Sequence, residues 1–504
     1  MKKSKKMTSL ALSAAMVASM FVSVPAAAEE NDAPFVALPM AAVETFNPYA
    51  TSGADKIALH QVFDYLFEYD NDGNPTPCLI DSYDISEDGK TYTLNLRQDV
   101  KFHDGCGFNA DDVVFSFDTM KDTDLGSTLL NAVSEVKKVD DYTVELTKGT
   151  AFSSVEKFLC DYLAIVDDDA YGEDGSSYVT SPVGTGAYKV DHIDETTSYV
   201  YLTANEDYFK GVPEVKNIEI HTPLDSSVAL VALENGEVDY ATMMNNSDLD
   251  IARGDDNIDV VGTEGWAQKM VILFGEPYNS DENLRKAIYY AINRENAAIY
   301  NGETEVKAAE NMYADRLMGD YAGSVDMEGY DPEKAADYLS KSSYDGSTLE
   351  INVTSDMEQI AVSMQADLTA AGITSEVNLI DTNTLTSKML DGTLGITCMD
   401  MGVAYSSPEE MMSYFTSTGF YGQSQLVATS DKTDGDIEAM KEMWNDDERK
   451  EAAVTALQDF KDLSIFFPLF SSNMYVAYNN KYAGVQPIWA PSFVPYFSQL
   501  TYAK

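Results

Sequence analysis

The sequence predicts a mixed α/β protein that folds into two or three domains. The chain has 504 residues, whereas one ordinary domain has roughly 150. Its first third carries short stretches in which apolar and polar residues alternate, as half-buried strands require. Its later part carries helical stripes and a strand–helix–strand unit. Because β-rich and α/β parts follow each other along the chain, we expect distinct domains.

The N-terminus has the pattern of a secretory signal peptide. A head with four lysines precedes an apolar run from Leu10 to Val24, and Ala26-Ala27-Ala28 supplies a small-residue cleavage site. We expect cleavage after Ala28, with an uncleaved membrane anchor as the alternative. Cys78 is the first cysteine, so no lipobox cysteine is present. The protein is therefore expected to be exported, to the periplasm or the outer face of the cytoplasmic membrane.

Strands are expected in the first third at 92–96, 142–146, 199–203 and 218–220, where apolar side chains alternate. Two acidic segments around Gly73 and Gly89 resemble calcium loops. Their twelfth positions are Leu79 and Asn95, however, and such a loop needs a glutamate there. We therefore interpret both segments as hairpin turns.

The later part of the chain is predicted to be more helical. Residues 284–292 form one apolar face, and Asp331 with Pro332 is typical of a helix start. A strand at 349–353, a helix at 360–371 and a strand at 377–379 form the strand–helix–strand unit. The charge-free run 463–480 contains Pro468 and polar residues, which favours buried strands over a membrane span.

Charge and composition exclude several classes of function. The chain has 84 acidic and 33 basic side chains, for a net charge of −51. A nucleic-acid binder needs a surplus of lysine and arginine, and an anionic membrane repels such a surface. We expect no nucleic-acid partner, and we interpret the charge as a means of solubility.

The four cysteines, Cys78, Cys106, Cys160 and Cys398, are widely spaced, so a zinc site is not expected. An exported chain can oxidise them, and two interpretations remain open: four buried free thiols, or one or two disulfides.

Motifs for catalysis are missing from the sequence. The four histidines have no metal-ligand spacing, and no nucleophile elbow, phosphate loop or dinucleotide fingerprint is present. We expect no enzyme activity, no catalytic residue, no metal site and no cofactor.

One block of sequence is highly specific. Residues 85–117 read ISEDGKTYTLNLRQDVKFHDGCGFNADDVVFSF. This block resembles the pattern DGK-x-Y-T-F-x-L-R-x-x-V-x-F-H-D-G of the extracytoplasmic solute-binding proteins of ABC importers, family 5, the oligopeptide/dipeptide/nickel-binding type. We expect its residues to be structural, with Gly105 and Gly186 giving backbone freedom in tight turns and Asp111 capping a helix that buries Val113 and Phe115.

The resemblance extends over most of the chain after the signal peptide. The matching segments are ETFNPYATSGADKIALHQVFDYL at 44–66, SPVGTGAY at 181–188, NEDYFKG at 205–211, NGEVDY at 235–240 and LRKAIYYAIN at 284–293. The family implies a fold of the type II periplasmic-binding-protein kind, with two hinge-linked α/β lobes, an extra β-rich lobe and a ligand cleft between them.

By this resemblance, lobe I comprises 29–61, 183–282 and 478–504, lobe II (the extra lobe) 62–182, and lobe III 283–477. The hinge is expected near 277–283 and 473–482. The resemblance implies a monomer that binds short peptides and delivers them to the permease subunits in the membrane.

The ligand residues follow less directly from the resemblance. Peptide-binding relatives carry W-x-x-D-Y-x-D-P, whose aspartate pairs with the peptide's α-ammonium; here that position is Ala404, while Tyr405 and Pro408 keep the pattern. A buried ammonium without a carboxylate is costly, so either Asp400 replaces the aspartate or the ligand has no free α-ammonium. The expected ligand residues are Thr51, Ser52, Gly53, Trp266, Asp400, Tyr405, Tyr421 and Gln425.

The departure at Ala404 keeps other solutes open. On the same fold, the alternatives are a glycoside, an opine-like compound or a metal chelate. From other classes, the alternatives are a secreted hydrolase, which would turn over its substrate, and a surface sensor or adhesin without a transporter.

Overall fold

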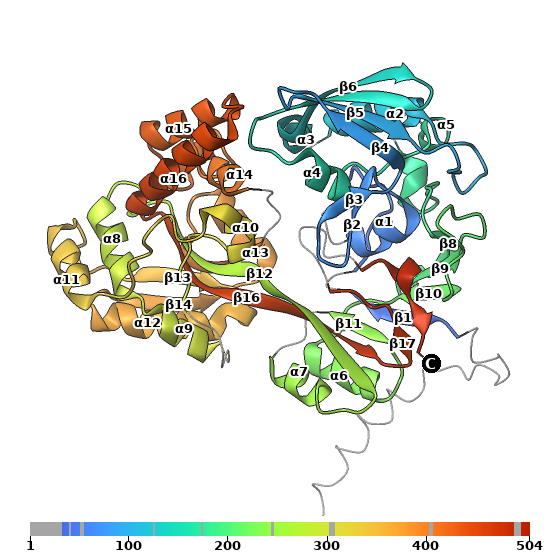
Figure 1. Cartoon of the computed structure of the whole chain (residues 1–504). Helices are drawn as coiled ribbons and strands as arrows, with labels where there is room; N and C mark the ends of the chain where they lie inside the picture. Colours follow the sequence, from blue (N-terminus) through green and yellow to red (C-terminus); the bar gives the residue numbers. More distant parts are fainter. Residues whose placement is uncertain are drawn as a thin grey trace, which may run out of the picture.

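The computed structural model of the chain describes residues 33–39, 42–50, 55–123, 126–172, 175–242, 246–301, 308–402, 407–487 and 495–503. Two bodies lie side by side, and the long strands β12 (Ile258–Phe274) and β16 (Phe466–Asn479) run from one body into the other (Figure 1). We call them the N-terminal body and the C-terminal body. The predicted signal peptide and its cleavage site lie outside the described residues.

The N-terminal body contains most of the short strands. Its elements are β1 (Phe35–Leu38), α1 (Lys56–Val62), β2 (Phe67–Tyr69), β3 (Pro75–Pro77), β4 (Ile80–Ile85), β5 (Thr91–Leu96), α2 (Ala110–Lys121), α3 (Gly126–Ala132), β6 (Val133–Asp140), β7 (Thr143–Lys148), α4 (Val155–Asp161), α5 (Asp168–Tyr171), η1 (Ser176–Val179), β8 (Tyr188–Ile193), β9 (Val200–Ala204), β10 (Asn217–Ile220), α6 (Ser226–Glu234), β11 (Tyr240–Thr242), α7 (Asn246–Ala252), β17 (Tyr482–Ala483), η5 (Phe497–Gln499) and β18 (Thr501–Tyr502).

The C-terminal body contains most of the helices. Its elements are α8 (Glu282–Ala291), α9 (Arg294–Tyr300), α10 (Asp315–Met318), η2 (Gly319–Tyr321), α11 (Pro332–Lys341), β13 (Leu349–Val353), η3 (Ser355–Met357), α12 (Glu358–Ala370), β14 (Ser375–Leu379), α13 (Thr382–Leu390), β15 (Gly395–Gly402), α14 (Pro408–Ser413), η4 (Gln423–Gln425), α15 (Asp431–Lys441) and α16 (Asp446–Leu463).

One sheet passes through both bodies. Its strand order is β14-β13-β15-β12-β16-β11-β1-β10-β9-β8. The β12–β16 pairing shifts register between Thr263 and Ala267, and there the Asn473 side chain accepts a hydrogen bond from the Gly265 N–H at 2.9 Å. A register shift adds local twist, so it marks where the strands pass from one body to the other. The predicted lobe boundaries stay a prediction.

The extra β-rich region is a separate four-stranded antiparallel sheet with the order β4-β5-β7-β6. Its strands confirm the predicted alternation, since Tyr92, Leu94 and Leu96 are buried along β5. The two acidic segments form the predicted hairpin turns, with Gly73 and Gly89 at φ of 77° and 71°.

The helix start that follows differs from the prediction. Asn109, not Asp111, is the N-cap of α2, and Asp112 completes a capping box with it. Asp111 is exposed and pairs with Lys138 at 2.8 Å. Val113 is fully buried as predicted, whereas Phe115 is only partly buried. An acidic side chain anywhere in the first turn interacts favourably with the helix dipole. The sequence alone therefore does not say whether Asn109 or Asp111 is the N-cap.

The family block closes onto the segment 181–188. His103 Nε2 lies 2.9 Å from the Gly186 carbonyl oxygen, and the His103 N–H donates to the Gly184 carbonyl at 2.8 Å. Gly105 has the predicted positive φ of 97°. Gly186 does not; a Cβ there would meet the Gln61 carbonyl oxygen at 2.5 Å. The second glycine therefore supplies space for α1 rather than backbone freedom.

The C-terminal body confirms the strand–helix–strand unit. β13 and β14 pair in parallel, and α12 crosses between them. Asp331 caps α11 with Pro332 at its first turn, as predicted. The charge-free run 463–480 forms the single strand β16, whose register shifts next to Pro468. Within the described part of the chain, no helix combines the length and apolarity that crossing a bilayer requires.

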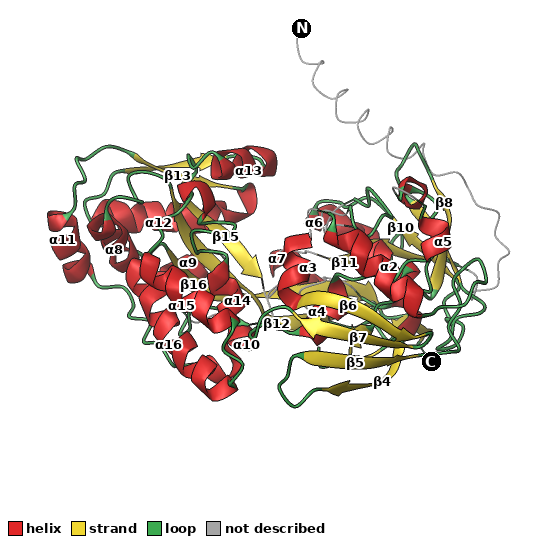
Figure 2. Ribbon diagram, turned by 90° about the horizontal axis from the view of Figure 1, so that it is seen from above, coloured by secondary structure: helices red, strands yellow, loops and turns green. Residues whose placement is uncertain are grey.

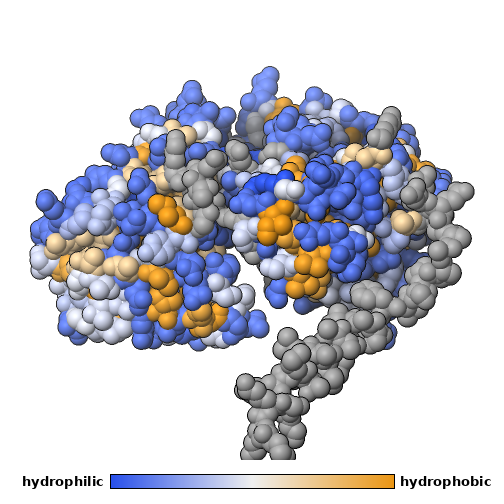
Figure 3. Space-filling view, turned by 90° about the horizontal axis from the view of Figure 1, so that it is seen from below, coloured by the Kyte–Doolittle hydropathy of each residue, from blue (hydrophilic) through white to orange (hydrophobic). Residues whose placement is uncertain are grey.

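The four cysteines are free, and three of them, Cys78, Cys160 and Cys398, are buried. Cys106 is exposed, which corrects the interpretation of four buried thiols. Seen from below, the surface is mostly hydrophilic, with apolar patches on both bodies (Figure 3). This agrees with the acidic composition.

Candidate functional site

The candidate site lies where the two bodies meet. The Ala151 N–H donates to the Lys441 carbonyl at 2.8 Å, and Arg316 Nη2 donates to the Gly73 carbonyl at 3.3 Å. Both views place α4 on the side of the N-terminal body that is turned toward α14 (Figures 1 and 2). The boundary therefore brings together groups that lie far apart in the sequence.

Helix α1 supplies two polar side chains to this region. Every residue of α1 is buried, including Lys56 (7% exposed) and His60 (6% exposed). They are one turn apart and share a face. The His60 ring stacks on Tyr65 at 4.2 Å, and within the described residues neither of its nitrogens has a hydrogen-bond partner. Burial, and then the Lys56 charge, hold the pKa of His60 well below its usual value.

Lys56 lies against the end of α4. Its Nζ is 4.0 Å from the centroid of the Tyr162 ring, a cation–π contact. Burial lowers the pKa of Lys56, and the charge of Asp161 opposes that shift. Asp161 itself accepts a hydrogen bond from the Tyr69 hydroxyl at 2.6 Å. We call Lys56, His60, Tyr65, Asp161 and Tyr162 the interlobe cluster.

Residues of the C-terminal body lie close to the interlobe cluster. After burial and Asp161, the charges that raise the pKa of Tyr162 are those of Tyr414, which follows α14, and Glu410 on α14. Burial lowers the pKa of Lys157 on α4, and the Arg316 guanidinium lowers it further. The charges of Glu410 and Asp161 oppose these two effects on Lys157, so cations and acids of both bodies meet at the boundary.

Several predicted ligand residues are not placed by the structure. Thr51, Ser52, Gly53 and Tyr405, together with Ala404, lie outside the described residues. Trp266 lies in β12 within the register shift, where the strands pass between the bodies. Its role stays a prediction.

Asp400 already has partners inside the sheet. Its Oδ2 lies 2.6 Å from Lys269 Nζ, and its Oδ1 accepts a hydrogen bond from the Ser472 hydroxyl at 3.1 Å. The side chains are 27% and 12% exposed for Asp400 and Lys269. The carboxylate is thus neutralised by β12, which leaves it less able to receive an ammonium from a ligand.

Tyr421 and Gln425 belong to the C-terminal body. The Tyr421 ring stacks on Phe415 at 4.9 Å, and its hydroxyl contacts the Met401 sulfur at 3.8 Å. Since neighbours on a strand point to opposite faces, Asp400 and Tyr421 lie on opposite sides of the sheet. Gln425 is exposed, and its carbonyl accepts a hydrogen bond from Asn279 at 2.6 Å. The structure therefore does not bring these three residues together.

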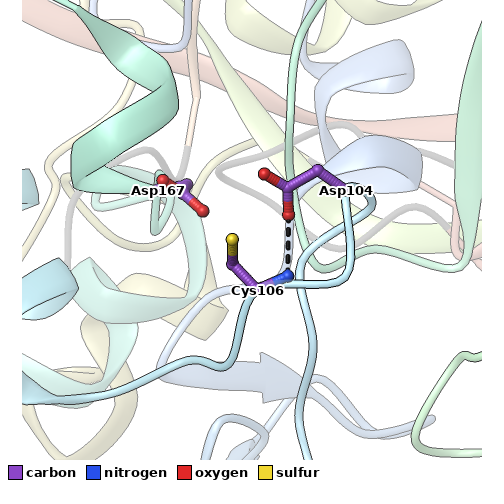
Figure 4. A group of neighbouring side chains, drawn as sticks. All are labelled: Asp104, Cys106 and Asp167. Atoms are coloured by element: carbon purple, nitrogen blue, oxygen red, sulfur yellow. Dashed lines mark hydrogen bonds between the residues drawn. The ribbon is translucent and has the colours of Figure 1, made fainter.

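Two groups of carboxylate and thiol side chains could offer ligands to a metal ion. Asp104, Cys106 and Asp167 converge (Figure 4), as do Asp112, Asp167 and Asp168. Asp104 already accepts the Cys106 N–H at 2.9 Å, and Asp167 caps α5. Hydrogen bonding by Asp104 raises the pKa of the Cys106 thiol, and burial raises the pKa of Asp112 to about 7. Protonated groups are poor ligands, so neither group carries a metal proposal.

Comparison with known proteins identifies the family. The profile of bacterial extracellular solute-binding proteins, family 5, matches residues 74–423. A Brucella ovis protein named as an ABC transporter peptide-binding protein is 30% identical over 404 residues, which cover 75% of each chain. The chain therefore belongs to family 5 of the bacterial extracellular solute-binding proteins.

Two further similarities agree with this assignment. The glutathione-binding protein GsiB of Pectobacterium atrosepticum is 28% identical over 314 residues, which cover 60% of this chain and 59% of GsiB. The chain thus matches less than two thirds of that relative's length. The substrate-binding protein CtaP of Listeria monocytogenes has the same fold, with a TM-score of 0.82, 23% identity and coverage of 94% of this chain and 100% of CtaP.

Sequence reasoning missed the interlobe cluster. Its one available signal was the pair Lys56 and His60, spaced by four residues within an otherwise apolar helix, directly after the Thr51–Gly53 segment. Asp161 and Tyr162 gave no signal, because acids and tyrosines are abundant throughout the chain.

Proposed function

We propose that this protein is the extracytoplasmic solute-binding component of an ABC importer and that it binds short peptides. The single observation that carries this proposal is the boundary between two bodies joined by β12 and β16, in a chain of the solute-binding family. A solute held at that boundary contacts both bodies at once. Binding then favours the form in which the bodies are closed together, and the permease recognises that form.

The named relatives favour peptides as the solute. One is named as peptide-binding and another as glutathione-binding. Peptides also suit a boundary that carries aromatic rings and both signs of charge, such as Tyr162, Lys157 and Glu410. We propose that the mature protein acts as a monomer at the outer face of the membrane, breaks no bond in its ligand and uses no cofactor.

A non-peptide solute on the same fold is the second candidate. Ala404 stands where peptide-binding relatives carry an ammonium-binding aspartate, and Asp400 is already paired with Lys269. A glycoside, an opine-like compound or a metal chelate needs no such aspartate. Four histidines in 504 residues make free nickel the weakest of these solutes.

Native mass spectrometry of the mature protein, purified without refolding, tests the proposal. We expect one bound peptide per chain, with a mixture of masses that fragment as peptides. A single non-peptide mass would replace peptides by the second candidate. Cleavage of an added peptide library, rather than its retention, would overturn the proposal in favour of a hydrolase. A chain that arrives empty is then given the library, and failure to retain any peptide would contradict peptide binding.

A further inference from the structure

The C-terminal body contains a cavity that shares no residue with the interlobe cluster. Its volume is about 1020 Å³, and its described lining residues come from the segments 293–299, 308–310 and 323–330. Pockets that enclose small molecules have volumes of about 300–1,000 Å³. None of the ligand residues expected from the sequence lines this cavity. It therefore has room for a small molecule at a place that the boundary between the two bodies does not use.

A buried arginine forms part of the cavity wall. Arg294 is 3% exposed, and its Nε and Nη1 have no hydrogen-bond partner among the described residues. Its Nη2 donates to the Glu328 carbonyl at 3.2 Å, and its Cζ lies 4.9 Å from the centroid of the Tyr289 ring. A guanidinium carries N–H donors on every nitrogen, and a buried donor without an acceptor is costly. Arg294 thus has donors that the fold leaves unused beside the cavity.

The groups next to Arg294 do not neutralise it. Within the described part of the chain it forms no ion pair, and the Glu328 carboxylate binds Lys334 and the Tyr290 hydroxyl instead. Burial raises the pKa of Tyr289, and the charge of Arg294 and a hydrogen bond with it oppose that shift. The Tyr289 hydroxyl donates to the Glu328 carbonyl at 3.0 Å and is neutral. The positive charge in the wall therefore lacks a negative partner.

The exposed part of the lining carries the opposite charge and an apolar surface. Glu295, Glu310 and Asp326 are exposed, and among the described residues none of them forms an ion pair. Ile299 and Tyr330 also line the cavity and are 67% and 46% exposed. A molecule that matches this lining has an anionic end, a cationic end and apolar groups between them.

We propose that this cavity is a second binding site, for a small zwitterion with apolar side chains, the size of a dipeptide. Its carboxylate meets Arg294, and its ammonium meets the exposed acids. Because so little of Arg294 is open, the group that meets it must be small, and a carboxylate also accepts two N–H bonds side by side. The three acids repel a purely anionic ligand, whereas the cationic end of a zwitterion attracts them.

A side chain added at Gly329 tests the cavity. Gly329 lines it, and a Cβ there would meet no atom within 4 Å, so Gly329→Leu fills the space without a clash of its Cβ. The probe is the dipeptide Leu-Phe, and native mass spectrometry counts the dipeptides bound per mature chain. We expect Gly329→Leu to bind one dipeptide fewer than the wild type. Gly435→Leu, at an exposed glycine with equal room, is the matched control and should bind the same number as the wild type.

Calorimetry then connects the site to its charges, with binding at the cavity taken as the difference between the wild-type and Gly329→Leu isotherms. C-terminal amidation of Leu-Phe and Arg294→Met are each expected to weaken this binding by about tenfold. Together they should weaken it no further, because both remove the same contact. An arginine with a purely structural role would weaken the unmodified and amidated dipeptides alike. N-acetylation and the double variant Glu310→Gln/Asp326→Asn should be related in the same way, and these exposed positions carry no packing role.

The outcomes separate this inference from the proposed function. Equal numbers of bound Leu-Phe in the wild type and Gly329→Leu would overturn the second site, and additive losses from amidation and Arg294→Met would overturn the role of the arginine. Neither result touches the boundary between the bodies, where Gly329→Leu should still retain members of a longer peptide library. Loss of that retention in the wild type and Gly329→Leu alike would contradict the proposed function instead.

Discussion

Two histidines, His103 and His60, show how differently the two polar regions of the N-terminal body are satisfied. His103, in the family block, has a partner for each ring nitrogen: the Gly186 carbonyl for Nε2 and the Gly184 N–H for Nδ1. His60, in the interlobe cluster, has none among the described residues. Hydrogen-bonded ring nitrogens stabilise the folded state, whereas buried nitrogens without a partner destabilise it. His103 is therefore better satisfied by the fold than His60.

The largest expected effect tests how closely the segment 181–188 packs against α1. In Gly184→Ala, the new Cβ would meet the Val62 carbonyl oxygen at 2.0 Å, so the backbone of α1 must move. We expect a loss of about 3 kcal/mol or more in the free energy of unfolding, measured by denaturant titration. Gly107→Ala, in the family block 85–117, meets no atom within 4 Å and is the matched control. Equal stability of the two variants would contradict the close approach.

The second prediction concerns pH. Burial lowers the pKa of His103 from 6.5 to about 4, and the hydrogen bond to the Gly186 carbonyl only partly opposes this shift. A lowered pKa in the folded state gives stability that is present above pH 6.5 and is lost as the pH falls toward 4. We expect His103 to account for about 2–3 kcal/mol of acid destabilisation in that window.

The check is a set of unfolding curves between pH 7 and pH 4 for the wild type and His103→Gln. The variant should lose less stability than the wild type over this range. His192→Gln, at an exposed position, is the control, and its curve should follow the wild type. Parallel curves for all three proteins would show that His103 does not titrate as proposed.

The third prediction separates Asp400 from the ligand. Asp400→Ala leaves Lys269 without its partner at 2.6 Å and is expected to cost about 2 kcal/mol in the free energy of unfolding. Its effect on solute affinity is expected to be small, because both carboxylate oxygens already have partners inside the sheet. Calorimetry and thermal melts of Asp400→Ala and the wild type measure the two quantities. A loss of affinity in Asp400→Ala without loss of stability would restore Asp400 as the ammonium-binding residue.

The smallest effect sharpens the contrast between the two histidines. His60→Phe replaces two unpartnered nitrogens by carbon while keeping a ring that stacks on Tyr65. We expect a gain of about 1 kcal/mol in the free energy of unfolding, whereas His103→Phe should be destabilising. Thermal melts at neutral pH compare them. Destabilisation of both variants by the same amount would remove the distinction on which the comparison depends.

Much of the fold was predictable from local sequence. Alternation at 92–96, the cap at Asp331 and the unit at 349–379 are short-range patterns, and the structure confirms each of them. The cap of α2 was assigned to Asp111 instead of Asn109, because several neighbouring residues can cap a helix and geometry selects one. The exposure of Cys106 depends on how its turn packs against α5, which local sequence does not encode.

The sequence by itself determined the class of protein, because dense motifs such as residues 85–117 record packing needs that few other folds share. It also determined several of the helices and strands through their periodicity. Only the tertiary structure decided which polar groups are left without partners. The two nitrogens of His60 are an example among the described residues, because whether a buried polar group is satisfied depends on the whole set of groups that folding brings around it.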